Sequence, residues 1–335
     1  MVYFTTISLI DKYNYPPIAK YSFNLENQRN NINIQQLNSE FGITNQVEFI
    51  AGKGDLPFMQ VNTAKASALI SIYAGQVLSF KPADETEDFM FISDNAYFSE
   101  GKAIKGGIPI CWPWFGAAPE QENMEQVKRP DHGFVRTNFW LVASVEVSGT
   151  GDTKIILEFK DTEETRKLWP YSFYLALEIV ISDSLTIELL TRNTGEQPFS
   201  ITEALHTYFN VGDATKVEVL GLEHTEYLDK KSDFVKVCQV GAITLSEETD
   251  HIHTDIKHGL VLNDPAFKRK IKISSSGNKN VVVLNPWVKG SAEMKDLDKD
   301  DYKHFICLEI ANAASDIVEI LPNSEYRIAT NYSIV

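Results

Sequence analysis

Hydrophobic and polar residues alternate with a period of two along most of the chain. Such alternation predicts half-buried strands, because successive side chains of a strand point to opposite faces of a sheet. The clearest runs are residues 67–73, 142–147, 154–159, 185–190 and 216–220. Turn-forming segments separate strand-like runs at a spacing of roughly ten residues, which favours an antiparallel β-sandwich over alternating βαβ units.

One window departs from this pattern and predicts a helix. Residues 161–169 begin with Asp161 and Thr162, either of which can cap a helix, and they end before Pro170. Acidic residues occupy the first turn and basic residues the last, which suits the helix dipole. We expect one or two helical turns on a connection between strands.

The N-terminal part of the chain has a different composition. Asparagine and glutamine are frequent between residues 22 and 38, whereas strand patterns dominate the remainder. We therefore predict an N-terminal appendage over residues 1–38. One continuous all-β domain is predicted over residues 39–335, because no further composition shift marks a linker.

Charge and cysteine content exclude several classes of protein. The chain has 335 residues, of which 31 are basic and 46 acidic, giving a formal net charge of −15. This balance disfavours nucleic acids and anionic membranes as partners. No leader with a basic start and no membrane-spanning run is apparent, and the 3 cysteines form no disulfide or zinc pattern. A cytoplasmic location is the simplest expectation.

Residues 106–116 form an unusual segment, Gly-Gly-Ile-Pro-Ile-Cys-Trp-Pro-Trp-Phe-Gly. Its glycines and prolines hinder both a helix and a central strand. Two interpretations stay open for its bulky aromatic residues. They can form a packed loop that closes one end of the sandwich, or they can form a pocket wall on which Trp114 offers a ring face to a sugar.

Two histidines lie in segments that suit a binding site. His132 and Arg136 come just before a predicted strand, and the planar guanidinium of arginine suits an oxyanion. In residues 202–212, alternation places His206 on one face with Ala204, Tyr208 and Asn210. Its ordinary pKa of about 6.5 makes His206 a candidate acid or base. For both histidines, a satisfied structural role is the alternative.

Glu309 is the one acid in an otherwise apolar strand-like run at residues 305–311. A buried unpaired carboxylate is costly, so Glu309 either has a function or lies at an exposed strand end. His251, His253 and His258 look like a metal cluster at first sight, but their surroundings are acidic and loop-like. We therefore expect no metal and no other cofactor.

Taken together, these segments resemble the aldose 1-epimerase (galactose mutarotase-like) superfamily, and within it the glucose-6-phosphate 1-epimerase branch. Residues 105–116 are similar to the family's Arg-Gly-Gly-Ile/Val-Pro motif, and residues 132–140 to its His-Gly-Phe/Leu-Ala-Arg-Asn motif. Residues 204–213 resemble its catalytic-histidine strand. Residues 227–230 and the stretch 285–309 match later motifs in the same order, and this order makes the resemblance specific.

The resemblance implies a β-supersandwich with few short helices and an isomerase that interconverts the α and β anomers of a hexose 6-phosphate, most simply glucose 6-phosphate. By the same matching, His206 would be the general acid and Glu309 the general base. The substrate-binding residues would be Lys105, His132, Arg136, Asp229 and Trp114, with Lys105 and Arg136 on the phosphate and Asp229 on a sugar hydroxyl. A monomer or weak homodimer with a small sugar phosphate as its partner is expected.

Two departures from the family pattern keep alternatives open. Lys105 stands where the family has arginine and lacks its bidentate fork, and Asp131 places an acid before His132. A mutarotase of unphosphorylated aldoses is one rival. A non-catalytic carbohydrate-binding sandwich that stacks sugars on Trp112, Trp114 and Trp287 is the other.

Catalysis also sets expectations for the two candidate acid–base groups. The imidazole of His206 and the carboxylate of Glu309 are expected to lie ~4–8 Å apart, so that both reach one sugar ring. Their mutual attraction is expected to raise the pKa of the histidine and to lower the pKa of the glutamate.

Overall fold

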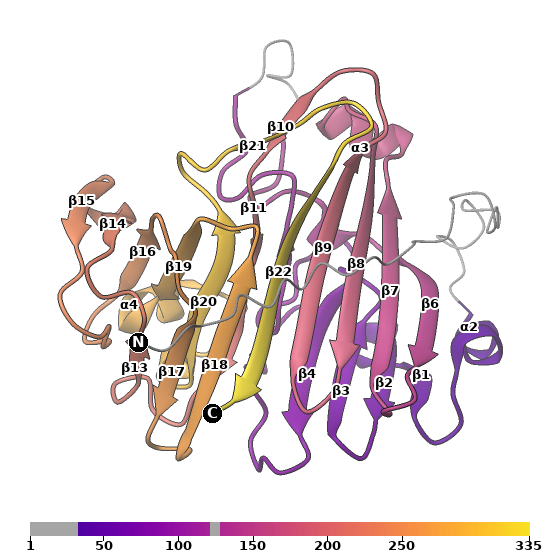
Figure 1. Ribbon diagram of the computed structural model, residues 1–335, viewed down its shortest axis with the longest axis horizontal. Coiled ribbons are helices and arrows are strands. Elements are labelled where there is room, and N and C mark those ends of the chain that lie inside the picture. The colour runs from indigo at the N-terminus through magenta and orange to yellow at the C-terminus, as the bar shows by residue number, and fades with distance from the viewer. Residues whose placement is uncertain (1–32, 121–127) are drawn as a thin grey trace, which may run out of the picture. The chain divides into compact units, whose positions relative to one another are not determined.

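The structure is a computed structural model that describes residues 33–120 and 128–335 (Figure 1). Most of the predicted appendage, residues 1–32, lies outside the described residues. The remainder begins helix α2 (Ile34–Phe41), which is capped by the Asn33 side chain and continues past the predicted boundary at residue 38. The separation of an appendage from the main domain stays a prediction.

Strands dominate the described chain, as the alternation predicts. Two large sheets each contain eight strands, and neighbouring strands pair antiparallel. The first, here called the β20 sheet, has the order β15-β14-β16-β19-β20-β11-β5, with β12 also paired to β20. Its strands are β5 (Ile110–Cys111), β11 (Glu203–Leu205), β12 (Tyr208–Asn210), β14 (Glu226–Asp229), β15 (Val235–Cys238), β16 (Thr249–His253), β19 (Asn280–Asn285) and β20 (Phe305–Asn312).

The second large sheet, here called the β8 sheet, has the order β13-β17-β18-β22-β9-β8-β7-β6. Its strands are β6 (Leu141–Val147), β7 (Thr153–Lys160), β8 (Phe173–Ile181), β9 (Leu185–Asn193), β13 (Glu218–Leu220), β17 (Leu260–Asp264), β18 (Arg269–Ser276) and β22 (Glu325–Ile334). Smaller sheets contain β1 (Val47–Ala51), β2 (Pro57–Asn62), β3 (Ala66–Ser71) and β4 (Gln76–Pro82), and β10 (Phe199–Ile201) with β21 (Val318–Ile320).

Helices in the described residues are short. Besides α2 there are α3 (Glu163–Leu168) and α4 (Trp287–Glu293), and the 3-10 turns η2 (Lys53–Asp55), η3 (Val135–Thr137), η4 (Lys230–Ser232) and η5 (Asp301–Lys303). Helix α3 confirms the predicted helix, with Thr162 as its cap. The five predicted runs overlap β3, β6, β7, β9 and β13, the last only at Glu218–Leu220. Among the described residues, no helix has the length and apolar character needed to span a bilayer.

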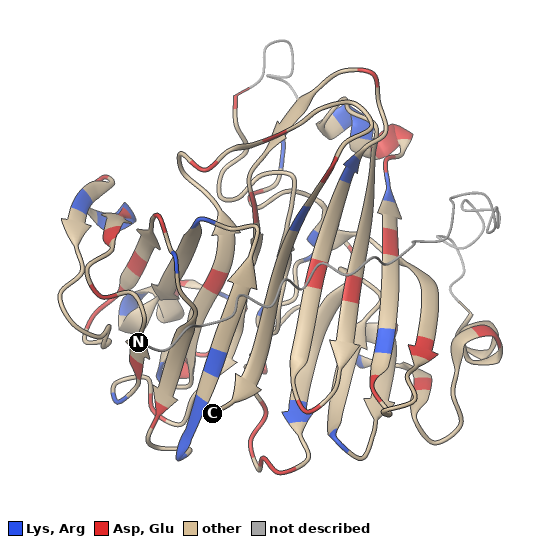
Figure 2. Cartoon of the chain, viewed as in Figure 1, with Lys and Arg blue, Asp and Glu red and all other residues tan. Residues whose placement is uncertain are grey.

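The sheets stack because each buries one face. Strand β22 of the β8 sheet packs against β20, and β8 packs against β3. On β7 the side chains alternate strictly between buried and half-buried, as period-two sequence requires. The strands of the β8 sheet carry residues of both signs of charge (Figure 2), including an ion pair of 2.7 Å between Lys154 Nζ and Glu178 Oε2. Strand β22 covers one face of β20, and the side chains on the opposite face of β20 are buried as well.

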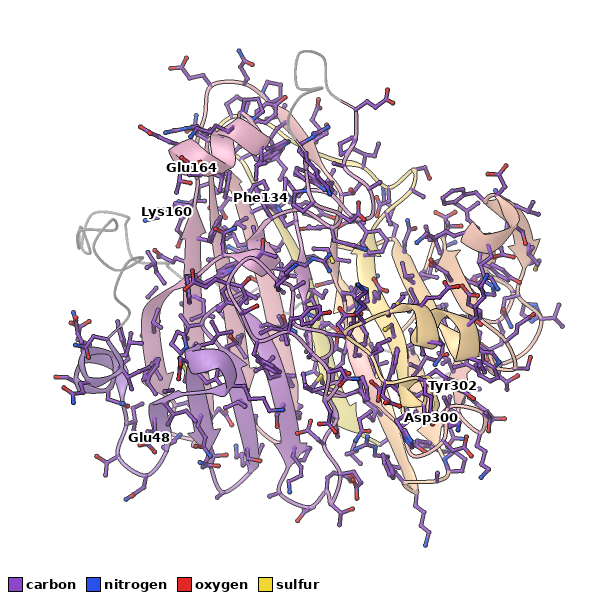
Figure 3. All side chains as sticks on the ribbon, turned by 180° about the vertical axis from the view of Figure 1, so that it is seen from behind. Glu48, Phe134, Lys160, Glu164, Asp300 and Tyr302 are labelled. Carbon is purple, nitrogen blue, oxygen red and sulfur yellow. The ribbon has the colours of Figure 1, made fainter. Side chains whose placement is uncertain are left out.

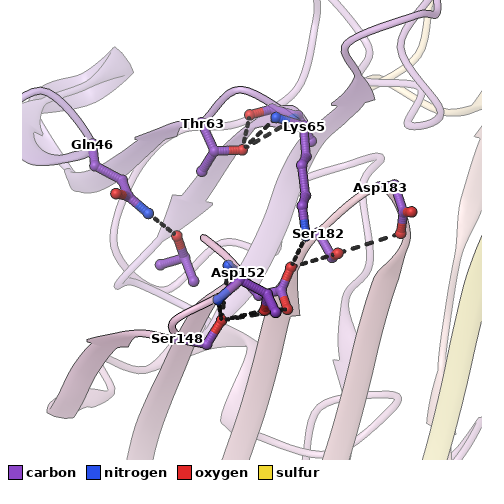
Figure 4. A network of polar contacts seen from close by, with 10 residues as sticks. Gln46, Thr63, Lys65, Ser148, Asp152, Ser182 and Asp183 are labelled. Carbon is purple, nitrogen blue, oxygen red and sulfur yellow. Dashed lines mark hydrogen bonds and ion pairs between the residues drawn. The ribbon is translucent and has the colours of Figure 1, made fainter.

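A polar network joins the four-stranded sheet to the turns of the β8 sheet (Figure 4). Asp152 accepts hydrogen bonds from Lys65 Nζ at 2.6 Å and from Ser182 Oγ at 2.7 Å. Gln46 Nε2 donates to Thr153 Oγ1 at 2.9 Å. These bonds lower the pKa of Asp152, with the Lys65 hydrogen bond as the main cause. The network fixes how the two sheets meet at this end of the sandwich.

A buried carboxyl group between the sheets gives a stability prediction. Glu203 is fully buried, and neither of its oxygens has a hydrogen-bond partner among the described residues. Burial raises the pKa of Glu203 from 4.5 to about 8, and Asp316 adds to the rise. The folded state therefore holds a proton that the unfolded chain releases. Its contribution to stability is complete below pH 4.5 and is lost as the pH rises toward 8.

Glu203→Gln is expected to remove this pH dependence. The amide stays neutral, so the variant should melt several degrees above the wild type near pH 8.5 and within a degree or two of it near pH 5. Thermal unfolding followed by circular dichroism at the two pH values checks this. Equal melting temperatures at the higher pH would show that Glu203 is not a neutral, buried acid.

Candidate functional site

Strand register brings His206 and Glu309 together. Leu205 pairs with Ile310 and Tyr208 pairs with Cys307, both across β20. The two residues between β11 and β12 continue this register, so His206 lies opposite Glu309. His206 Nε2 is 3.2 Å from Glu309 Oε1. This distance is shorter than the expected ~4–8 Å, because the groups are cross-strand neighbours rather than residues of opposite walls.

The ladder is irregular at the histidine. The His206 N–H donates to the Pro109 carbonyl and the Thr207 N–H to the Leu205 carbonyl, each at 3.0 Å, while the Thr207 carbonyl accepts from the Leu308 N–H of β20 at 3.1 Å. The imidazole stacks on Tyr208, with ring centroids 4.8 Å apart and planes at 7°. This contact confirms that both side chains lie on one face, as the alternation predicts.

The pair is buried and incompletely hydrogen-bonded. Glu309 has no exposed side-chain surface, and the His206 side chain is 7% exposed. Neither carboxylate oxygen of Glu309 nor Nδ1 of His206 has a hydrogen-bond partner among the described residues, since the 3.2 Å contact is not aligned as a hydrogen bond. Unsatisfied buried polar groups are few in folded proteins, and an acid and a base that lack partners side by side are a candidate functional site.

Burial decides the protonation of this pair. It raises the pKa of Glu309 well above its usual value, and Asp250 adds to the rise. It lowers the pKa of His206 well below its usual value, and nearby positive charge adds to the fall. The expectation of a charged pair with opposite shifts is therefore wrong for the ligand-free site, because desolvation exceeds the attraction between the two groups.

His132 lies beside the pair in a strained turn. His132 and Gly133 both have positive φ, and a Cβ on Gly133 would lie 1.8 Å from the Trp112 carbonyl oxygen. Nδ1 of His132 accepts a hydrogen bond of 3.3 Å from the Gly116 N–H, which leaves Nε2 as the donor. Its ring lies edge-on to His206 at 5.8 Å. Burial lowers the pKa of His132 to about 3, so the ring is neutral.

Two of the predicted cations act on the electrostatics of the pair. Arg136 and Lys105 both lower the pKa of His206 through their positive charge. Arg136 donates one hydrogen bond of 3.0 Å, to the Asp131 carbonyl, while Asp131 itself is exposed. Lys105 Nζ lies 3.4 Å from Asp296 Oδ2. With respect to residues 33–120 and 128–335, Arg136 therefore keeps most of its donors available, whereas Lys105 already has a counterion.

Asp229 is not brought to the site. Leu228, Ile252, Val282 and Glu309 form one cross-strand row, so they share a face of the β20 sheet. Asp229, one residue later, points to the other face. Its carboxylate accepts from the Lys231 N–H at 3.0 Å and from Ser232 Oγ at 2.6 Å. The hydroxyl-binding role implied for Asp229 is not supported, because side-chain parity turns it away.

Trp114 is likewise unavailable as a stacking platform. It is 2% exposed, its Nε1 donates to the Pro130 carbonyl at 2.9 Å, and its ring packs on Phe134 at 5.7 Å. Phe134, which is labelled in Figure 3, also contacts the fully buried Trp112. Trp112 and Trp114 therefore belong to a packed loop, which is the first of the two interpretations given for residues 106–116. Within this segment, Phe115 is the aromatic residue beside the site, half-buried and 5.0 Å from the His132 ring.

An ion pair that the sequence did not predict lies on the Glu309 face. Lys230 Nζ is 2.7 Å from Asp250 Oδ2, and Lys230 also lies over the Phe115 ring at 5.9 Å. Asp250 shares the face of Cys307 through Leu284, and its Oδ1 is buried with no partner among the described residues. Both groups act on the pKa of Glu309. Lys230 follows Leu228 by two residues and therefore shares its face, whereas Asp229 does not. This difference could be recognised only once the strand register was known.

The remaining histidine cluster lies on the opposite face. His251 stacks on Tyr227 at 4.1 Å, and His253 Nδ1 is 2.9 Å from Thr225 Oγ1.

Two surface cavities have volumes of about 380 and 500 Å³. One lies against α2 and β1, the other lies at β17 and β18, and neither shares a residue with the His206 and Glu309 pair.

Comparison with known proteins gives consistent matches. The sequence profile of the family described as Aldose 1-epimerase matches residues 59–333. The chain is 36% identical to the "Putative glucose-6-phosphate 1-epimerase" of Escherichia coli over 261 residues, which cover 78% of this chain and 84% of that protein. A protein of the same name from Cenchrus ciliaris is 35% identical, over 78% and 79% of the two chains. The crystal structure of "a putative mutarotase (YeaD)" from Salmonella typhimurium superposes with a TM-score of 0.80 at 30% identity, over 88% of this chain and 95% of that one.

Proposed function

The chain belongs to the aldose 1-epimerase family and is an epimerase of carbohydrate metabolism, and on this premise we propose that His206 and Glu309 interconvert the anomers of a hexose 6-phosphate, glucose 6-phosphate first. The observation that carries the proposal is the buried acid–base pair, 3.2 Å apart, whose lone pairs have no other use among the described residues. A catalytic pair of this kind needs only a proton donor and a proton acceptor.

The reaction exchanges two protons around one carbon. Glu309 takes the proton of the C1 hydroxyl while His206 donates a proton to the ring oxygen, so that the bond from C1 to the ring oxygen breaks and a C1 carbonyl forms. Rotation about the bond between C1 and C2 presents the other carbonyl face. The reverse proton transfers close the ring and restore both side chains. The two oxygens are attached to the same carbon, so an acid and a base only 3.2 Å apart can serve both.

The pair starts this cycle with one proton in total. In the ligand-free site, burial keeps that proton on Glu309 and leaves His206 neutral. The roles implied by the family require the proton on His206. Because Oε1 and Nε2 are 3.2 Å apart, the proton can move between them when a polar substrate replaces the apolar surroundings.

Arg136 is the best-placed phosphate ligand. Its guanidinium is half-buried and positive, and one hydrogen bond to a carbonyl leaves donors for a bidentate contact with phosphate. Lys105 is proposed as a secondary contact, because phosphate must compete with Asp296 for its ammonium group. His132 and Phe115 are proposed to contact the sugar. The His132 ring contacts the imidazole of His206, and the Phe115 ring contacts the His132 ring.

The ion pair of Lys105 favours an unphosphorylated aldose as the second candidate substrate, because it reduces the positive charge offered to a phosphate. Exchange NMR on glucose and glucose 6-phosphate, side by side, tests the proposal. Enzyme-dependent exchange is expected for both, and it should be faster for glucose 6-phosphate at equal concentration. Exchange of glucose alone would move the substrate to free aldoses. Exchange of neither would leave a carbohydrate-binding protein without this activity.

The activity is expected to persist at pH values above 6.5. Ordinary groups with pKa values of 4.5 and 6.5 would limit a glutamate–histidine pair to a narrow bell between these values. With the pKa of Glu309 raised and that of His206 lowered, the pair holds a single proton over a pH range that extends below 4.5 and above 6.5. The pH profile of kcat/KM should be measured with glucose, which has no titrating phosphate. A decline in kcat/KM that begins near pH 6.5 would contradict the protonation described here.

A further inference from the structure

Three potential metal ligands converge where the acid and base meet. Cys307 and Glu309 are two residues apart on β20 and share a face, and His206 faces them from the link between β11 and β12. One ligand atom from each lies within 4.8 Å of the other two, and all three residues are buried. This is the one group of three or more histidine, cysteine or acidic side chains with this spacing in the described part of the chain.

The distances suit a small tetrahedral ion. Zinc binds nitrogen and oxygen at ~2.0–2.2 Å and sulfur at ~2.3 Å, so two of its ligands lie roughly 3.3 Å apart. His206 Nε2 and Glu309 Oε1 already have this separation, at 3.2 Å. The thiol of Cys307 needs to approach by about an ångström, which a rotation of a short side chain provides.

A second observation points to a ligand at the same place. Both oxygens of the fully buried Glu309 have no hydrogen-bond partner among the described residues, although one of them lies against the imidazole nitrogen. Lone pairs that converge without a shared hydrogen bond are available to an electrophile. The thiol makes the set thiophilic, which favours zinc over magnesium or calcium.

We propose that His206, Cys307 and Glu309 form a binding site for Zn²⁺, with water as the fourth ligand, and that the bound ion inhibits the enzyme. Binding places Zn²⁺ on the neutral imidazole and releases the protons of the Cys307 thiol and of Glu309 to solvent, with no change of oxidation state. The ion would bind the imidazole nitrogen of His206 and the carboxylate oxygen of Glu309, which exchange protons with the substrate during anomer exchange. The site itself is independent of the reaction, and only the inhibition rests on the proposed function.

Cobalt supplies a readout that does not depend on activity. Co²⁺ takes the same ligands as Zn²⁺ and absorbs strongly in the near ultraviolet when a thiolate binds it. Because Cys238 is an exposed thiol, the titration should use the Cys238→Ser variant as the reference protein. One equivalent of Co²⁺ is expected to produce the thiolate band, and one equivalent of Zn²⁺ should abolish it. The band should be absent from the Cys238→Ser, Cys307→Ser double variant.

X-ray absorption of the zinc-loaded protein covers the case in which the Cys307 variant does not fold. One sulfur near ~2.3 Å together with nitrogen and oxygen ligands supports the site, and a shell of oxygen and nitrogen alone overturns it. A cobalt band that survives Cys307→Ser also overturns it. A band in a protein that exchanges no anomers supports the metal site while rejecting the proposed function. Exchange that is unaffected by a saturating equivalent of Zn²⁺ rejects the inhibition.

Discussion

Glu309→Gln is expected to lower kcat for anomer exchange by about 10²–10⁴-fold, the usual contribution of a positioned general acid or base. Glutamine keeps the shape of the side chain but cannot accept the C1 hydroxyl proton. The ring then opens only as fast as water can remove that proton. Saturation-transfer NMR on glucose 6-phosphate, with the uncatalysed rate subtracted, measures the loss.

The same substitution should not destabilise the fold. Glu309 is buried, and its carboxyl oxygens have no hydrogen-bond partner among the described residues, so the protein gains nothing in stability from the carboxyl group there. The melting temperature of the variant should equal or exceed that of the wild type, as expected where function is kept at the expense of stability. A fall of many degrees would make Glu309 a structural residue.

Glu203→Gln is the matched control. It makes the same chemical change at a second fully buried glutamate, on the strand that pairs with β20, but on the face that packs into the core. Its kcat is expected to match the wild type. A comparable loss of kcat in both variants would show that any change in buried charge slows the enzyme.

The sequence alone could predict which residues share a strand face, but not which strands meet. Alternation placed His206 with Tyr208, and the ring stacking of the two confirms it. That His206 meets Glu309, from a run a hundred residues later, depends on long-range register, and only the family resemblance supplied it. The same lack of register explains Asp229. Residues 227–230 were matched to a family motif, but the pairing of β14 with β16 turns Asp229 to the face opposite Glu309 and leaves Lys230 on the Glu309 face.

Burial was the other quantity beyond the reach of the sequence. An aromatic-rich loop is compatible with either a sugar platform or a plug, and only packing shows that Trp112 and Trp114 are enclosed. The pKa shifts of the acid–base pair follow the same rule. A sequence shows opposite charges and suggests attraction, whereas the fold removes both groups from water and makes desolvation the larger effect.

Arg136→Ala is expected to separate the two candidate substrates. A charge-assisted hydrogen bond contributes about 1.5–3 kcal/mol, so kcat/KM for glucose 6-phosphate should fall by roughly 10–100-fold. Free glucose has no group that requires the guanidinium, and its kcat/KM should change by less than about 3-fold. Initial rates of anomer exchange on both sugars, taken at low substrate concentration, give the two ratios directly.

Lys105→Met is the variant with which the loss of kcat/KM in Arg136→Ala should be compared. The ammonium group of Lys105 is 3.4 Å from the carboxylate of Asp296, so a phosphate gains its charge only by displacing that partner. Its removal should therefore cost glucose 6-phosphate less than the removal of Arg136 does, and the effect of Lys105→Met should weaken with added salt because the pair is partly exposed. Equal losses of kcat/KM on both sugars in Arg136→Ala would mean that the guanidinium supports the fold of the site and not a phosphate. The larger loss in Lys105→Met would move the phosphate to the Asp296 side of the catalytic pair.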